Sequence, residues 1–214
     1  MRARRTASLR RVAPATDARA VPRDAAVGGP LDEDRASPLV VGVVVWLASE
    51  VMFFGGLFAA WFVLKAHNEP NWPPPGEELE VLRTAVFTVV LLLSSLTVHQ
   101  AVAAAERGDR RTSLRWLALT IVMGASFLTN EVLEWISLPF GFDASAFSTI
   151  YYLLTGFHGA HVLGGLVLMG SVAWVVFSKA SRAPSHEAMR CVGYYWHFVD
   201  VVWAVLFLVV YVLT

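Results

Sequence analysis

Five long apolar runs dominate this sequence of 214 residues, and they leave few folds open. An α-helix needs about 20 mostly apolar residues to cross the hydrocarbon core of a bilayer. Strands of a membrane barrel are about half that length and alternate polar with apolar residues, which these runs do not do. The runs therefore predict an all-α integral membrane bundle of five transmembrane helices, at Leu39–Leu64, Thr84–Ala105, Leu114–Leu138, Phe147–Phe177 and Cys191–Leu213.

The composition excludes several other classes of protein. Hydrophobic residues make up 56% of the chain and charged residues 16%, whereas a soluble domain has about 45–50% and 25%. The 17 basic and 17 acidic residues cancel, so no nucleic-acid partner is expected. Cys191 is the one cysteine, which excludes a disulfide framework and a multi-cysteine metal site.

Residues 1–37 differ from the rest of the chain. They hold eight arginines and five acids but almost no large apolar residues. Such a segment cannot bury enough surface to offset the entropy lost on ordering. We therefore expect two parts: a disordered, Arg-rich cytoplasmic tail over 1–37 and a membrane domain over 38–214.

Basic residues near the spans predict the orientation, because cytoplasmic loops are enriched in lysine and arginine. With five spans, the tail, the loop at Arg107–Arg115 and the loop at Lys179–Arg190 fall on one side. The two opposite loops are poor in basic residues. The N-terminus is therefore predicted to be cytoplasmic and Thr214 to lie outside.

Ionisable side chains inside the spans are the candidate functional residues, because burial in hydrocarbon is costly for them. They are Glu50, His99, Glu131, Glu134, His158, His161, His197 and Asp200. Glu50 lies roughly 17 Å along its helix, near the middle of the bilayer. A proton-related or regulatory role for Glu50 and a simple hydrogen bond to a neighbouring helix both remain open from the residues alone.

Three pairs of these residues have i, i+3 spacing, which places each pair on one helix face. They are Glu131 with Glu134, His158 with His161, and His197 with Asp200. Two such faces can build a metal site, but the Glu-x-x-His pattern of metal-binding bundles is absent. Interhelical hydrogen bonding is the favoured interpretation, with Asp200 bonded to His197 or to a neighbouring helix, and no metal site is predicted.

Small and aromatic residues predict packing surfaces. Gly156, Ala160 and Gly164 form a ridge on the fourth span, and Gly55 and Gly56 do the same on the first. Such ridges admit a helix or a lipid tail at close range. Aromatic side chains near the span ends are expected to be interfacial anchors, namely Trp61, Trp72, Trp116, Trp135 and Tyr211.

Three stretches resemble the signature segments of cytochrome c oxidase subunit III. They are Trp46–Phe54 (WLASEVMFF), Thr155–Val162 (TGFHGAHV) and Tyr195–Trp203 (YWHFVDVVW). Glu106–Asp109 (ERGD) and Trp72–Pro75 (WPPP) are similar to the actinobacterial branch. The resemblance extends from about Pro38 to Thr214.

This resemblance implies a five-helix form that lies beside subunits I and II of a respiratory oxidase in the bacterial plasma membrane. Subunit I would carry the haems and copper, and this chain would bind no metal. The family's roles are to hold phospholipid, to stabilise the complex and to sustain proton uptake during turnover. Glu50 matches the family's carbodiimide-reactive carboxylate. Glu134, the paired histidines and the last-helix His197 and Asp200 match its other polar positions.

Two positions depart from the family pattern. Glu131 stands where glutamine is usual, and Arg190 stands where many relatives have glutamate. The same subunit in a quinol oxidase or a nitric-oxide-reductase system is the nearest alternative. An independent membrane enzyme or carrier that uses the Glu and His pairs is the alternative from another class.

The orientation can be tested by cysteine accessibility labelling in intact cells. We expect a cysteine at Gly76 to react with an impermeant reagent from outside, and one at Asp109 to react only after the membrane is opened. The reverse pattern would contradict the predicted orientation.

Overall fold

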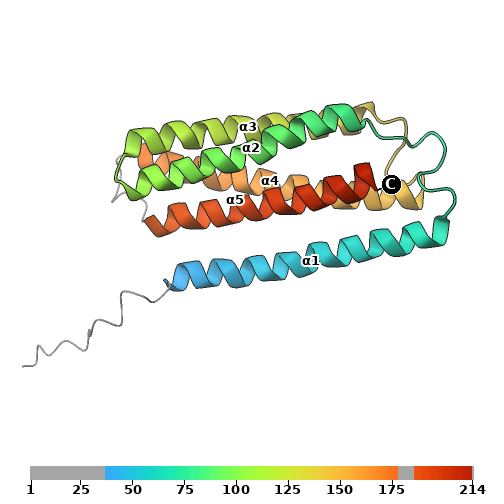
Figure 1. The fold of residues 1–214 in the computed structure, drawn as a ribbon, viewed down its shortest axis with the longest axis horizontal. Helices are drawn as coiled ribbons and strands as arrows, with labels where there is room; N and C mark the ends of the chain where they lie inside the picture. The colour runs from blue at the N-terminus through green and yellow to red at the C-terminus, as the bar shows by residue number, and fades with distance from the viewer. Residues whose placement is uncertain (1–36, 178–185, 214) are drawn as a thin grey trace, which may run out of the picture. The chain divides into compact units, whose positions relative to one another are not determined.

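The computed structural model describes residues 37–177 and 186–213, which form an antiparallel bundle of five long helices (Figure 1). These are α1 (Pro38–Asn68), α2 (Val81–Glu106), α3 (Arg110–Ser137), α4 (Ala146–Phe177) and α5 (His186–Phe207), which ends in a π-helical turn, Leu208–Val212. All five are long and apolar enough to span a membrane, and no strand occurs within those ranges. The predicted five-span, all-α fold is confirmed. The predicted tail lies outside the described residues, apart from Ser37.

Capping and turn residues set the helix ends. Ser37 accepts a hydrogen bond from the amide of Val40, and Pro38 follows at the first helical position, where its missing N–H costs nothing. Asp109 caps α3 by accepting from the amide of Thr112 at 3.1 Å, and hydrogen bonds from Thr112 lower the pKa of Asp109. Gly108 has a φ of +76°, a conformation that favours glycine, and it reverses the chain between α2 and α3.

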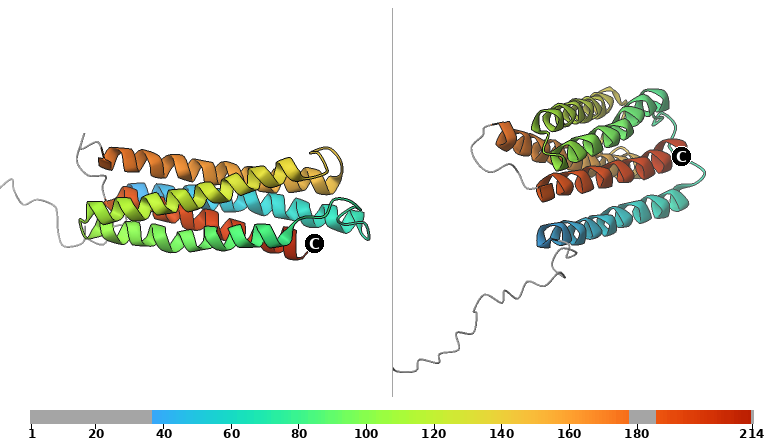
Figure 2. Two further views of the ribbon diagram at one scale, coloured as in Figure 1. Left: turned by 90° about the horizontal axis from the view of Figure 1, so that it is seen from above. Right: turned by 60° about the vertical axis from the view of Figure 1, so that its left-hand side comes forward.

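Helix α5 lies in the middle of the bundle and packs against α1, α2 and α4, while α3 lies against α2 and α4. Helix α1 lies at the edge, beside α5 and α4 (Figures 1 and 2). The helix ends alternate, so the α2–α3 turn lies at the same end of the bundle as the start of α5. The loops 69–80 and 138–145 and residue Leu213 lie at the other end (Figure 1).

Two tryptophans of α5 form the centre of the core. Trp196 is fully buried, and its indole N–H donates to Ser94 of α2 at 2.8 Å. Trp203 donates to Thr88 of α2 at 2.9 Å and packs edge-on against Phe127 of α3 at 4.6 Å between ring centroids. Buried tryptophan usually finds an acceptor for its N–H, and both do so here.

Two glycines, which have no Cβ, leave the space that the Trp196 ring occupies. A Cβ added at Gly165 of α4 would lie 2.8 Å from the ring, and one at Gly124 of α3 would lie 2.7 Å from it. These glycines, with Gly159, make the close helix contacts of the bundle. The predicted ridge on α4 is less enclosed: Ala160 and Gly164 are exposed, but a Cβ at Gly164 would lie 3.2 Å from the Tyr195 hydroxyl and one at Gly156 3.6 Å from Trp135. A Cβ at Gly55 or Gly56 would meet nothing within 4 Å.

Three of the predicted interfacial anchors are wrong. Trp61, Trp72 and Tyr211 are buried, with exposed fractions of 0%, 8% and 7%. Trp61 and Trp72 meet edge-on at 5.1 Å and both pack on Phe147, so they join α1 and the loop after it to the start of α4. Only Trp116 and Trp135 remain partly exposed. Tertiary packing has drawn the other aromatic side chains into the core.

Candidate functional site

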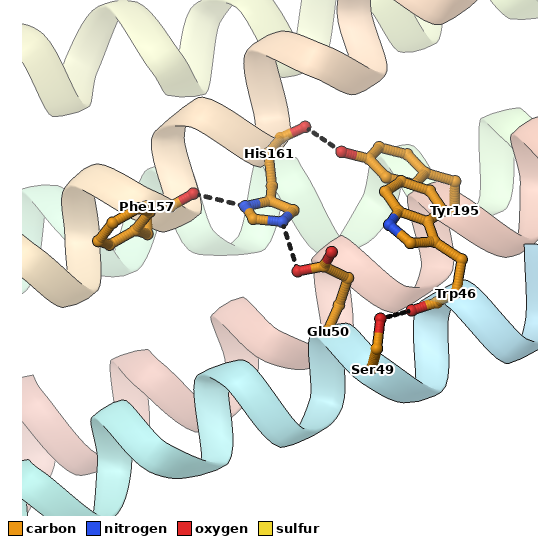
Figure 3. A network of polar contacts seen from close by, with 6 residues as sticks. All are labelled: Trp46, Ser49, Glu50, Phe157, His161 and Tyr195. Carbon is orange, nitrogen blue, oxygen red and sulfur yellow. Dashed lines mark hydrogen bonds and ion pairs between the residues drawn. The ribbon is translucent and has the colours of Figure 1, made fainter.

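Glu50 and His161 form a polar contact between α1 and α4 (Figure 3). Glu50 Oε2 lies 3.2 Å from Nε2 of His161, and the two side chains are 20% and 17% exposed. Phe54 packs on the imidazole with 5.1 Å between ring centroids. Glu50 is therefore paired with a neighbouring helix in a largely apolar setting, which is one of the two interpretations that the sequence left open.

The second nitrogen of His161 fixes how many protons this pair holds. His161 Nδ1 lies 2.7 Å from the carbonyl oxygen of Phe157, which can only accept, so Nδ1 carries a hydrogen (Figure 3). The Glu50 contact then needs one more proton, either on the carboxyl group or on Nε2. The contact can thus form with one proton shared between the carboxyl group and the imidazole.

Aromatic side chains surround this pair on the α5 side. The Tyr195 hydroxyl donates to the carbonyl oxygen of His161 at 2.9 Å. The Tyr195 ring stacks on Trp46 at 5.5 Å with planes 4° apart (Figure 3). Both rings also line an apolar groove of about 570 Å³ between α1, α4 and α5, together with Gly164. The proton-sharing pair and the groove are therefore connected through one tyrosine.

Glu134 is the centre of a second polar cluster, at the end of the bundle that carries Leu213. Its carboxyl group accepts from Thr84 at 2.9 Å, from Tyr211 at 2.9 Å and from Tyr151 at 3.4 Å. The donors come from α2, the π-helical turn and α4, so this one buried side chain connects α3 to three other segments. Sequence analysis missed Tyr211 as a partner, because its position near a span end suggested an anchor.

The last-helix pair, His197 and Asp200, is joined through a residue that the sequence did not single out. Ser95 of α2 donates to Oδ2 of Asp200, and its hydroxyl lies 2.9 Å from Nδ1 of His197. Asp200 is 2% exposed. Asp200 thus bonds to a neighbouring helix, as expected. Serine is too common in membrane helices for Ser95 to have been identified from sequence.

Glu131 and His158 are buried without a hydrogen-bonding partner among the described residues. Glu131 lies against α4 at Gly159, where an added Cβ would come 2.9 Å from its Oε2. His158 lies 4.8 Å from the ring of Trp203 and 5.9 Å from that of Phe127. His158 therefore faces the core, whereas its partner in sequence, His161, contacts α1.

No described residues bring three or more His, Cys, Asp or Glu side chains together in a way that would hold a metal ion. The polar side chains inside the bundle instead connect helices in pairs and triads. The arrangement can therefore hold and share protons and can orient helices.

Comparison with known proteins gives the family. Residues 15–214 match the family model described as cytochrome c oxidase subunit III. The chain belongs to the cytochrome c oxidase subunit III family. It is 42% identical to the probable cytochrome c oxidase subunit 3 of Mycobacterium tuberculosis over 183 residues, which cover 83% of this chain and 89% of that protein.

A second relative comes from another bacterial group. The chain is 40% identical over 181 residues to the cytochrome c oxidase subunit 3 of Thermostichus vulcanus, covering 82% of this chain and 87% of that one. With its five spans and these bacterial relatives, this subunit III family member is a multi-pass protein of the plasma membrane. The resemblance predicted from the sequence motifs is confirmed.

The Glu134 cluster gives a testable stability difference. Tyr211→Phe removes one of the three donors and should lower the free energy of unfolding by about 0.5–1.5 kcal/mol. Glu134→Leu leaves buried hydroxyl groups without their acceptor and should cost more, about 1–3 kcal/mol. Unfolding of the purified chain by denaturing detergent in mixed micelles measures both values.

Tyr194→Phe is the matched control, because Tyr194 is 45% exposed. It should leave the unfolding curve unchanged. Equal stability of Glu134→Leu and Tyr194→Phe would show that Glu134 does not hold the helices together.

Proposed function

We propose that this chain is the accessory, cofactor-free subunit of a respiratory terminal oxidase that oxidises cytochrome c, reduces oxygen to water and pumps protons. In this proposal it lies beside subunits I and II, stabilises the catalytic subunit and takes no part in the redox chemistry. The family match over 15–214 is the observation that carries the proposal.

The names of the relatives favour cytochrome c over quinol as the electron donor of the complex. Both relatives described above are named as subunits of a cytochrome c oxidase. Neither of these two relatives is named as a subunit of a quinol oxidase or of a nitric-oxide-reductase system. The independent-enzyme alternative would need the Glu and His pairs to converge on one centre, whereas His158 and His161 point to different helices.

A phospholipid tail in the α1–α4–α5 groove is part of the proposal. The groove is lined by apolar side chains such as Val43, Leu168 and Val172, and its volume of about 570 Å³ suits acyl chains. The exposed Gly164 lies in its wall, which supports the predicted lipid role of that ridge over a helix-packing role. The orientation, with the N-terminus cytoplasmic, also remains a proposal that rests on the loop arginines.

A sustaining role in proton uptake is assigned to Glu50. Its shared proton with His161 supports a group that can pick up and release protons near the middle of the membrane. Tyr195 and Trp46 line the groove beside this pair, and Tyr195 also bonds to the carbonyl oxygen of His161. In this proposal, lipid bound in the groove and the protonation of the Glu50–His161 pair influence one another through these two residues. The chemistry of oxygen reduction itself would proceed without Glu50.

The proposed function is tested by affinity purification of this chain from its host in mild detergent. We expect haem spectra of an oxidase, two larger catalytic subunits identified by mass spectrometry, cytochrome c oxidation by the preparation, and phospholipid that survives washing. Recovery of the chain without haem and without partner subunits would contradict the proposal.

Glu50 variants in the same complex test its role. Glu50→Gln keeps the size and a hydrogen-bonding head group, so assembly, haem spectrum and the initial rate of oxygen consumption should change by less than about two-fold. Glu50→Ala also opens a cavity beside Phe54 and should assemble less well. Oxygen consumption followed to inactivation should show a shorter working life for both variants.

Ser49→Ala is the neighbouring control, since Ser49 bonds only to the carbonyl of Trp46 on its own helix among the described residues. Immediate and complete loss of activity in assembled Glu50→Gln complex would show that Glu50 takes part in the reaction. That result would contradict the accessory role.

A further inference from the structure

A half-open pocket lies between α2 and α5 on the outside of the bundle. It has a volume of about 330 Å³ and is lined by His99, Glu106, Arg190, Tyr194 and His197, among others. His99 lies about 10 Å along α2 from Glu106, which ends the helix. Two imidazoles therefore stand at the surface of segments that cross the hydrocarbon region.

This surface is polar where the rest of the exposed face of α2 is apolar. His99 and the adjacent Gln100 are exposed, whereas other exposed positions on α2 include Leu92, Leu93 and Leu96. No described residue hydrogen-bonds the His99 ring or the Gln100 amide. Polar side chains that face lipid tails are costly, so these two require a hydrogen-bonding partner from outside the chain.

His197 is held in place from inside the bundle. Its Nδ1 bonds to Ser95, which also donates to the buried Asp200. A bond at one ring nitrogen fixes the role of the other. Its Nε2 has no hydrogen-bonding partner among the described residues, and the ring lines the pocket beside His99. The pocket thus offers hydrogen-bonding groups that are already oriented by the bundle.

A lipid headgroup fits this pocket poorly. Arg190 Nε bonds to Glu106 at 2.7 Å, so its guanidinium already has an acidic partner within the chain. The imidazoles also lie about 10 Å further along their helices, toward the middle of the spans, than this ion pair. The apolar groove suited to acyl chains lies elsewhere, against α1 and α4. A protein side chain is the better occupant.

We propose that the α2–α5 surface around His99 and His197 is the interface with a transmembrane helix of another oxidase subunit, which presents a hydrogen-bonding side chain to these imidazoles. The inference rests on the proposed function, since it requires a multi-subunit complex. In membrane proteins polar side chains stabilise helix association, because lipid tails supply no competing hydrogen bonds. Arg190, which stands where many relatives have glutamate, pairs with Glu106 at the edge of this interface.

Site-specific photo-crosslinking in the intact complex tests the surface directly. A benzophenone amino acid at Gln100 should cross-link this chain to another membrane-spanning subunit. The same amino acid at Val122, which is 64% exposed on α3, should yield lipid adducts. Subunit cross-links from Val122 and not from Gln100, or lipid adducts alone from both, would overturn the inference. The proposed function would still stand if the chain purified with haem.

Retention of the subunit gives a second readout. His99→Leu should lower the amount of this chain per haem after detergent washing by about 3- to 20-fold, the range expected for one interhelical hydrogen bond. Its thermal midpoint as an isolated chain should match wild type, because His99 is exposed. Thr129→Val, a similar polar-to-apolar change at an exposed position of α3, should leave retention unchanged. Equal retention in both variants would overturn the inference.

Discussion

Trp196 makes the contact on which the rest of this bundle depends. One buried indole reaches three other helices, because its N–H bonds to Ser94 of α2 and its ring fills the space left by Gly124 of α3 and Gly165 of α4. Lipid tails are as apolar as leucine, so helix association in a membrane depends on close packing and on polar contacts. Trp196 supplies both at the same point, which explains why α5 occupies the middle of the fold.

Buried polar side chains then connect the helices at three levels. Glu134 connects α3 to α2, α4 and the π-helical turn near one end, and Ser95 joins α2 to His197 and Asp200 of α5. Glu50 and His161 do the same for α1, which has fewer buried residues than the other helices. Because α1 is held at a few points, an apolar groove remains beside it, next to the contact between Glu50 and His161.

The outer surface divides by chemistry. Exposed valine and leucine on all five helices suit a lipid environment, whereas the side chains of His99 and Gln100 on the α2–α5 side make no hydrogen bond among the described residues. Under the proposed function, this subunit acts through such surfaces and through bound lipid and protons. In the proposals made above, the two sides of α5 therefore differ, with lipid and the Glu50–His161 pair toward α1 and a partner helix toward α2.

The sequence by itself determined the five spans, the family and the positions of the buried ionisable residues, because length, hydropathy and motif order are properties of the chain alone. It did not determine which partner each ionisable residue meets. His158 and His161 share a spacing but face the core and α1 respectively, since that choice depends on where α1 packs. Trp61, Trp72 and Tyr211 were predicted at the membrane interface, yet tertiary packing buries them. On α4, Gly159 and Gly165 make the closest approaches, 2.9 and 2.8 Å from an added Cβ, whereas Gly156 and Gly164 of the predicted ridge meet Trp135 and Tyr195 less closely, because the rotation of α4 against α3 and α5 decides which face is inside.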